Sequence, residues 1–135
     1  MLDRLEGNLY VDGDSGRISD YRGKVLLLYL WGTWCAPCKG ETPHLRQAFD
    51  TYYEHGLEIL GVAKRDEPEV IREYVKQHGM PWRQTAEPEE GPIIALYRAE
   101  AVPNMVLIDR NGRIVRRALR GRELMKALEP LFAND

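Results

Sequence analysis

The chain has 135 residues, enough for one domain with a hydrophobic core, and its content of 44% hydrophobic and 30% charged residues excludes a disordered or fibrous protein. Its formal net charge of -2 offers no strong field to attract nucleic acid or an anionic membrane, so no nucleic-acid partner is expected. We therefore expect residues 1–135 to form a single globular domain.

The first half of the chain predicts two short strands, a buried strand and a long helix. Residues 9–19 contain the turn-forming run Asp-Gly-Asp-Ser-Gly and are expected to form the two short strands around it. Residues 25–31 are continuously apolar, which indicates a central strand buried on both faces. The helix is expected to run to Gly56 with a kink at Pro43. Its apolar face consists of Leu45, Ala48, Phe49, Tyr52 and Tyr53.

The second half of the chain alternates strands with helices. The expected strands are 59–63, 81–85, 105–108 and 113–117, the last two joined by a turn at Asn111-Gly112. Helices are expected from Pro68 to a cap at Gly79, at 91–98, and over 124–132, where Pro130 is awkward. The apolar faces of the first and last of these helices consist of Val70, Ile71, Tyr74 and Val75, and of Leu124, Leu128, Leu131 and Phe132. This alternation predicts an α/β fold with a mixed sheet covered by helices on both faces.

The chain holds only two cysteines, Cys35 and Cys38, which are three positions apart. A disulfide scaffold needs more cysteines linking distant segments, and a structural zinc site needs four ligands. The three histidines form no ligand cluster with the pair, so no metal and no cofactor is expected. We interpret the pair as a redox couple; half a metal site and two inert core thiols are the alternatives.

The cysteine pair lies where the buried strand gives way to the helix. Free backbone N–H groups and the helix dipole favour a thiolate at Cys35 and can lower a cysteine pKa from about 8.5 into a range of roughly 3.5–7.5. Cys35 is expected to be the exposed nucleophile that attacks a target disulfide. Cys38 lies one turn further into the helix and is expected to resolve the mixed disulfide.

Residues 31–43 have the sequence Trp-Gly-Thr-Trp-Cys-Ala-Pro-Cys-Lys-Gly-Glu-Thr-Pro, which closely resembles the active-site segment of thioredoxin-like proteins. More narrowly, the segment resembles that of the TlpA/ResA group of extracytoplasmic thiol–disulfide oxidoreductases. The resemblance extends over residues 12–132. It implies a thioredoxin fold with an N-terminal β extension, an inserted helix-strand segment at 67–85, and a cis-proline at Val102-Pro103 opposite the cysteines.

The same resemblance implies roles for individual residues. Cys35, Cys38 and Glu41 would be catalytic, with Glu41 relaying a proton to or from Cys38 and, when ionised, raising the pKa of a nearby thiol. The alternative for Glu41 is an acid that only complements the helix dipole. Substrate contacts are implied for Trp34, Ala36, Pro37, Val102 and Pro103.

The chain departs from the family pattern at four positions. Tyr29 replaces the buried Asp of thioredoxin, so that proton acceptor must come from elsewhere or be absent, and the TlpA-like group commonly lacks that Asp too. Val102 and Asn104 replace threonines beside the cis-proline and should alter how a substrate backbone is held. Gly32 replaces a common Ala, and we expect this replacement to be neutral.

The resemblance implies an enzyme that reduces or exchanges disulfides in other proteins, in a setting such as cytochrome c maturation. Its partners would be protein thiols and disulfides, together with a redox protein that recharges the cysteine pair. Because Ala36 and Pro37 carry no charge to stabilise a thiolate, we expect a reductant with a potential nearer the about −270 mV of thioredoxin than the about −120 mV of DsbA.

The location and two other functions stay open. An extracytoplasmic location is implied, with a cytoplasmic one as the alternative; no signal peptide or apolar span is apparent, so a membrane anchor is expected only outside this chain. A copper chaperone on the same fold would carry a His near the cis-proline, and residues 100–104 offer none. A peroxidase variant would place a lone peroxidatic cysteine in a different motif.

Overall fold

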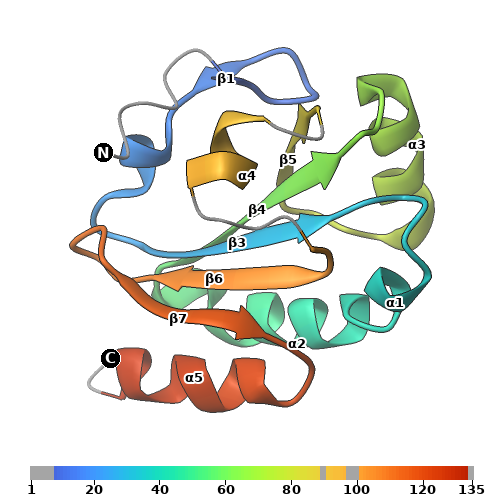
Figure 1. Ribbon diagram of the computed structural model, residues 1–135. Helices are drawn as coiled ribbons and strands as arrows, with labels where there is room; N and C mark the ends of the chain where they lie inside the picture. Colours follow the sequence, from blue (N-terminus) through green and yellow to red (C-terminus); the bar gives the residue numbers. More distant parts are fainter. Residues whose placement is uncertain (1–7, 89–90, 97–100, 134–135) are drawn as a thin grey trace.

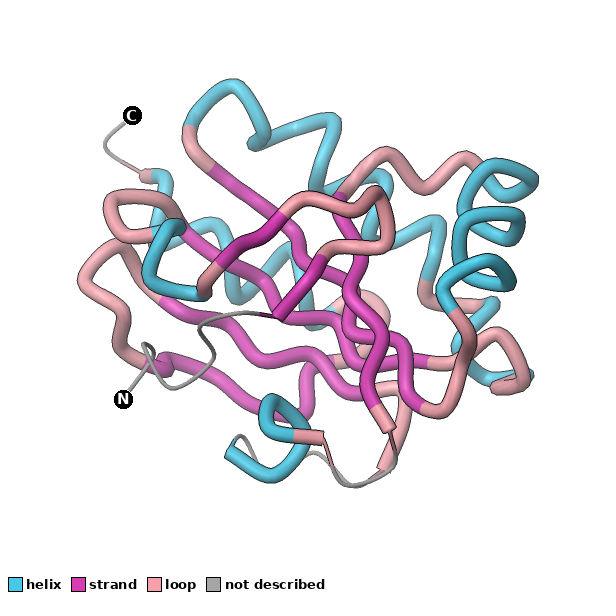
Figure 2. Tube along the Cα trace, turned by 90° about the horizontal axis from the view of Figure 1, so that it is seen from above, coloured by secondary structure: helices cyan, strands magenta, loops and turns pink. Residues whose placement is uncertain are grey.

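The computed structural model describes residues 8–88, 91–96 and 101–133 and shows an α/β architecture built on a mixed five-stranded sheet (Figure 1). Its strands are β3 (Val25–Trp31), β4 (Leu57–Lys64), β5 (Arg83–Glu87), β6 (Asn104–Ile108) and β7 (Ile114–Leu119). They lie in the order β5-β4-β3-β6-β7, with β3, β4 and β5 mutually parallel and β6 antiparallel to both of its neighbours. Figure 2 shows the twist of these strands from above.

The remaining elements cover the sheet. The helices are α1 (Ala36–Lys39), α2 (Thr42–Tyr52), α3 (Pro68–His78), α4 (Pro92–Leu96) and α5 (Glu123–Phe132), with short 3₁₀ helices η2 (Ile18–Tyr21) and η3 (Tyr53–His55). A separate two-stranded ribbon pairs β1 (Asn8–Leu9) with β2 (Ser15–Gly16), which agrees with the expected N-terminal β extension. Helices α1, α2 and α3 lie in the connections between parallel strands, because parallel pairing requires a long crossover.

Strand β3 is buried on both faces, as its continuous apolar sequence predicts, and all seven of its residues are buried. Leu27, Tyr29 and Trp31 alternate into the core shared with α2, α3 and α5, whereas Leu28 and Leu30 face the core shared with η2 and α4. Figure 1 shows α2 and α5 below the sheet and α4 and β1 above it. The predicted sheet with helices on both faces is confirmed.

The predicted kinked helix after the cysteines is two helices instead. Helix α1 ends at Lys39, and α2 begins after an N-cap at Glu41 with Pro43 in its first turn. Proline has no N–H to donate, and the first turn is where a missing donor costs least. The first helix therefore ends before Pro43 and a second helix begins there, so no single helix is kinked at this proline.

Further details differ from the predictions. Tyr53, expected on the apolar face of the helix after the cysteines, is 49% exposed and lies in η3. Val70 is 48% exposed, because α3 faces the core through the neighbouring Ile71, which lies about 100° further round the helix. The 3₁₀ helix η2 was not predicted, since four residues carry no periodic pattern. Of the helix expected over 91–98, α4 forms the part up to Leu96, and residues 97–98 lie outside the described residues.

Candidate active site

Cys35 and Cys38 form a disulfide at the start of α1, with their Cα atoms 5.4 Å apart. Cys35 is the N-cap residue of α1, and its Sγ accepts a hydrogen bond from the backbone N–H of Cys38 at 3.3 Å. An N-cap side chain normally satisfies one of the unpaired N–H groups of the first turn. An N–H group placed in this way at a helix start favours a thiolate on the N-cap cysteine when the disulfide is reduced.

Neither cysteine is exposed in this disulfide form. Cys35 is 5% exposed and Cys38 is 2% exposed, and both belong to the core shared with α2 and α5. The expectation of an exposed Cys35 is wrong for this state, because the disulfide ties its side chain back over the first turn of α1. Ala36 and Pro37, which separate the cysteines, are exposed.

Tyr29, which the resemblance places at the position of the thioredoxin Asp, lies fully buried beneath α1. Its hydroxyl donates a hydrogen bond to the carbonyl oxygen of Cys38 at 3.0 Å. Burial raises the pKa of Tyr29 well above its usual value, and the charge of Glu41 raises this pKa further. Tyr29 is therefore a fixed hydrogen-bond donor at neutral pH and does not replace the missing proton acceptor.

Glu41 lies at the junction of α1 and α2 and is half-buried. Its Oε1 accepts a hydrogen bond from the backbone N–H of Gly121 at 2.7 Å, which ties this junction to the turn before α5. Its side chain makes no capping hydrogen bond to α2. The carboxylate also acts on the buried Tyr29 hydroxyl through its charge. Glu41 thus has a structural contact in addition to its place near the redox pair.

Trp34, the residue before Cys35, folds back over the chain and remains 46% exposed. Its indole N–H donates to the carbonyl oxygen of Lys64 at 2.8 Å. The ring lies directly on Gly32, where an added Cβ would stand 2.5 Å from the indole Cε2. The expectation that Gly32 is equivalent to Ala is wrong here, because an alanine methyl group would displace the indole. Trp31, by contrast, is in the core as expected.

The loop after β4 holds the active-site segment in place. Asp66 accepts two hydrogen bonds from Thr33, one from its backbone N–H at 2.8 Å and one from its hydroxyl at 2.6 Å. The guanidinium of Arg65 lies 4.3 Å from the centroid of the Trp34 ring. Sequence reasoning missed both residues, because partners so far apart along the chain leave no local pattern.

The Val102-Pro103 peptide bond is cis, as expected. Asn104, the next residue, pairs with Leu30 in the antiparallel ladder of β6 and β3, so the cis-proline lies at the end of the sheet from which the active-site segment departs. Pro103 is buried and Val102 is half-buried. The Oδ1 of Asn104 is buried and has no hydrogen-bond partner in the part of the chain that the structure describes.

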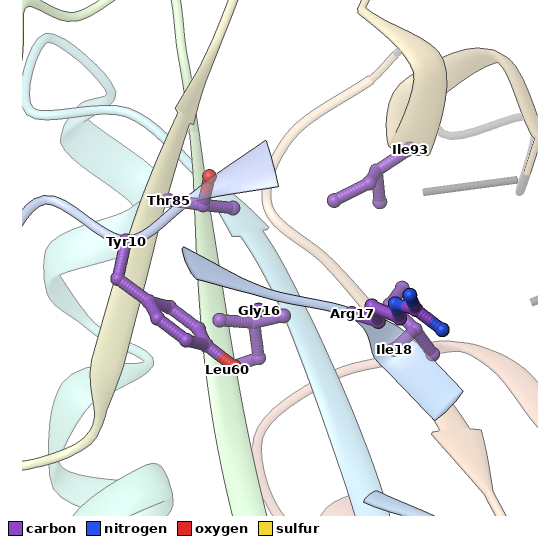
Figure 3. A pocket seen from close by; sticks show the side chains of 7 residues that line it. All are labelled: Tyr10, Gly16, Arg17, Ile18, Leu60, Thr85 and Ile93. Carbon is purple, nitrogen blue, oxygen red and sulfur yellow. The ribbon is translucent and has the colours of Figure 1, made fainter. Parts of the chain in front are cut away.

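A small cavity lies on the opposite face of the sheet from the cysteines, between the N-terminal ribbon, β4, β5 and α4 (Figure 3). Its volume is about 10 Å³, which is room for roughly one water molecule. The cavity is therefore too small for a substrate. The lining residues are Tyr10, Gly16, Arg17, Ile18, Leu60, Thr85 and Ile93.

Within residues 8–88, 91–96 and 101–133, no three His, Cys, Asp or Glu side chains gather in a way that would hold a metal ion. Among the helices of the same residues, none has the length and apolar character needed to cross a membrane.

Comparison with known proteins agrees with this site. Residues 5–117 match the model of the AhpC/TSA family. The thiol-disulfide oxidoreductase ResA of one strain of Bacillus cereus is 32% identical over 120 residues, covering 88% of this chain and 68% of that protein. ResA of Geobacillus kaustophilus is 31% identical over 102 residues, covering 76% of this chain and 58% of that protein.

Solved structures show the same likeness. The thioredoxin domain of a thiol-disulfide oxidoreductase from Bacteroides vulgatus superposes with a TM-score of 0.84 at 25% identity, covering 93% of this chain and 91% of that one. A putative thiol:disulfide interchange protein DsbE from Chlorobium tepidum gives a TM-score of 0.78 at 26% identity, covering 93% and 89%. Fold and redox disulfide together define a thioredoxin-fold thiol–disulfide oxidoreductase. The chain belongs to the AhpC/TSA family and, within it, to the ResA-like thiol–disulfide oxidoreductases.

Proposed function

We propose that this protein reduces disulfide bonds in other proteins, with Cys35 as the attacking thiol and Cys38 as the resolving thiol. The observation that carries this proposal is the N-cap position of Cys35, whose sulfur faces the backbone N–H of Cys38. The same hydrogen bond favours ionisation of Cys35 over Cys38 in the reduced state.

The reaction proceeds in two exchanges. The Cys35 thiolate attacks one sulfur of the target disulfide, so that the target S–S bond breaks, a mixed disulfide forms and the first target sulfur leaves and takes up a proton. The Cys38 thiolate then attacks the Cys35 sulfur, which releases the second target thiol and forms the Cys35–Cys38 disulfide. The target gains two electrons and two protons, and a redox partner must return the same number to the enzyme.

Residues around the cysteines supply the remaining functions. Glu41 accepts the proton of Cys38 before the second exchange, a role that Tyr29 cannot take because its hydroxyl stays protonated at neutral pH and a neutral phenol is not a base. The exposed positions Ala36 and Pro37, together with Trp34, contact the substrate from the side of α1. The backbone at Val102 and Pro103 pairs with an extended substrate segment from the other side.

An extracytoplasmic setting and a reducing direction belong to the same proposal. The resemblance of the active-site segment implies the extracytoplasmic setting, and the reducing direction follows from the uncharged residues between the cysteines, which favour the disulfide form of the enzyme. Equilibration with dithiothreitol buffers, followed by Trp34 fluorescence, measures the potential. A value near that of DsbA would contradict the reducing role.

The reductase proposal is tested by insulin reduction with dithiothreitol as the electron donor, beside assays of copper binding and peroxide consumption. The protein is expected to accelerate insulin precipitation, whereas Cys35→Ser and Cys38→Ser are expected to abolish the acceleration. Copper binding or peroxide consumption without insulin reduction would favour the metal-chaperone or peroxidase alternative and would overturn the proposal.

A further inference from the structure

An exposed cation–aromatic pair lies beside the redox disulfide. Trp34 directly precedes Cys35 and is 46% exposed, and the guanidinium of Arg65 lies 4.3 Å from the centroid of its ring. Arg65 is itself exposed and is the first residue after β4. A substrate segment that approaches Cys35 from this side meets both side chains.

The backbone holds Arg65 in a conformation that its side chain does not favour. Its φ angle is +58°, in the left-handed region that non-glycine residues rarely adopt. The N–H of Arg65 donates to the carbonyl oxygen of Glu87 at 2.8 Å, and the neighbouring Asp66 is bound to Thr33. Glycine adopts this conformation more readily than arginine does, so the backbone conformation does not explain why an arginine stands at position 65. Such strain often marks functional positions.

The charge of Arg65 has no carboxylate partner in the described part of the chain. The adjacent carboxylate of Asp66 directs one oxygen to the N–H and the other to the hydroxyl of Thr33. A guanidinium stacked on an aromatic ring keeps its N–H edge available, and that edge matches the two oxygens of a carboxylate. The pair therefore presents an apolar face and a carboxylate-binding edge together.

We infer that Arg65 and Trp34 form a specificity-determining surface that favours target disulfides flanked by Asp or Glu residues. This inference rests on the proposed reductase function. The indole packs against the substrate backbone next to the reacting sulfur, and the guanidinium binds the flanking carboxylate. A target flanked by Lys would bring like charges together at the same place.

The test uses three short peptides, each with one cysteine in a mixed disulfide with the same small thiol. The residues on both sides of that cysteine are Asp, Asn or Lys, and the peptides are otherwise identical. The kcat/KM of the protein with dithiothreitol as reductant is divided by the rate of dithiothreitol alone, which removes the intrinsic effect of the flanking charges. The wild type is expected to favour the Asp peptide over the Lys peptide by about two- to fivefold, the range of exposed charge pairs.

Charge variants identify the residue responsible. Arg65→Gln is expected to bring the ratio for the Asp and Lys peptides close to one, and Arg65→Glu is expected to reverse the order. Arg113→Glu is the matched control: it makes the same charge change at an exposed arginine beyond the far end of β6, and it should keep the wild-type ratio. The preference should shrink as salt is added.

Two results would overturn the inference while leaving the proposed function intact: equal rates for all peptides with the wild type, or an unchanged ratio in Arg65→Glu. If the ratio is unchanged because Arg65→Glu slows all peptides equally, Arg65 has a structural role. A wild type that reduces none of the three peptides would overturn the proposed function as well.

Discussion

Two side chains from different elements, Tyr29 and Glu41, make the polar contacts near Cys38. The Tyr29 hydroxyl from β3 donates to the Cys38 carbonyl, and Glu41 binds the Gly121 N–H while its charge acts on Tyr29. A buried tyrosine remains protonated, so Tyr29 does not act as an acid or base at neutral pH, and the proposed mechanism assigns proton transfer near Cys38 to Glu41. The sequence shows that the thioredoxin Asp is missing, but the contact of Glu41 with a residue 80 positions away could not be predicted from it.

The variant Glu41→Gln separates the charge of Glu41 from its hydrogen bond. The amide oxygen of Gln can still accept from the Gly121 N–H, whereas the negative charge is lost. If Glu41 opposes thiolate formation, both thiol pKa values should fall, because a like charge is removed. The pH dependence of iodoacetamide labelling measures these values.

The matched variant Glu41→Ala also loses the hydrogen bond, and it should cost about 1–3 kcal/mol in the free energy of unfolding. Glu41→Gln should cost less in the same urea titration. If the thiol titration curves of Glu41→Gln match those of the wild type, the role of Glu41 is limited to its hydrogen bond with Gly121.

At the scale of elements, the active-site segment is positioned by the connection from β4 to α3. The apolar runs of β3 and β4 and the cap at Gly79 could be predicted, because they follow from local periodicity and turn chemistry. The hydrogen bonds between Thr33 and Asp66 could not be predicted, since they link separate crossovers. The break between α1 and α2 does not follow from the sequence, because Pro43 fits either a kink or a first turn.

Removing the Asp66 carboxylate should loosen this connection. Asp66→Ala deletes both hydrogen bonds to Thr33, and the expected loss in the free energy of unfolding is about 1.5–3 kcal/mol, the range for bonds to a charged group. Thr33→Val removes only the hydroxyl bond and should cost less. Urea unfolding of the oxidised protein measures both. A greater loss in Thr33→Val than in Asp66→Ala would contradict this assignment.

For the whole molecule, alternation of side chains along β3 predicts two cores, and both are present. Periodicity fixes which elements pack against the sheet, but it does not fix how far each apolar face extends. Val70 is half exposed for that reason. The surface that Arg65 and Trp34 form could not be predicted from the sequence either, because the position of Arg65 over Trp34 depends on the tertiary arrangement.

Burial of Tyr29 is expected to make the free energy of unfolding depend on pH in the alkaline range. The pKa of Tyr29 lies well above its usual value in the folded protein, chiefly because of burial, whereas in the unfolded chain it is about 10. The stabilising contribution is therefore complete below about pH 10 and is lost as the pH rises above that value. This residue alone should give a slope of about 1.4 kcal/mol per pH unit.

Tyr29→Phe tests this slope. Urea unfolding of the oxidised wild type and variant between about pH 8 and pH 11 should show a shallower alkaline decline in the variant. At neutral pH the variant should be less stable by about 0.5–1.5 kcal/mol, because the bond to the Cys38 carbonyl is lost. Parallel declines in the two proteins would show that Tyr29 ionises as readily in the folded state as in the unfolded state.

The central claim, that Cys35 attacks target disulfides and Cys38 resolves the product, is tested most directly by trapping the mixed disulfide. Reduced Cys38→Ser, incubated with a disulfide-containing protein such as insulin, should accumulate an adduct joined through Cys35, as determined by mass spectrometry of its peptides. Reduced Cys35→Ser under the same conditions should accumulate none. A stable adduct through Cys38 in Cys35→Ser, together with no adduct in Cys38→Ser, would reverse the assigned roles and contradict the account.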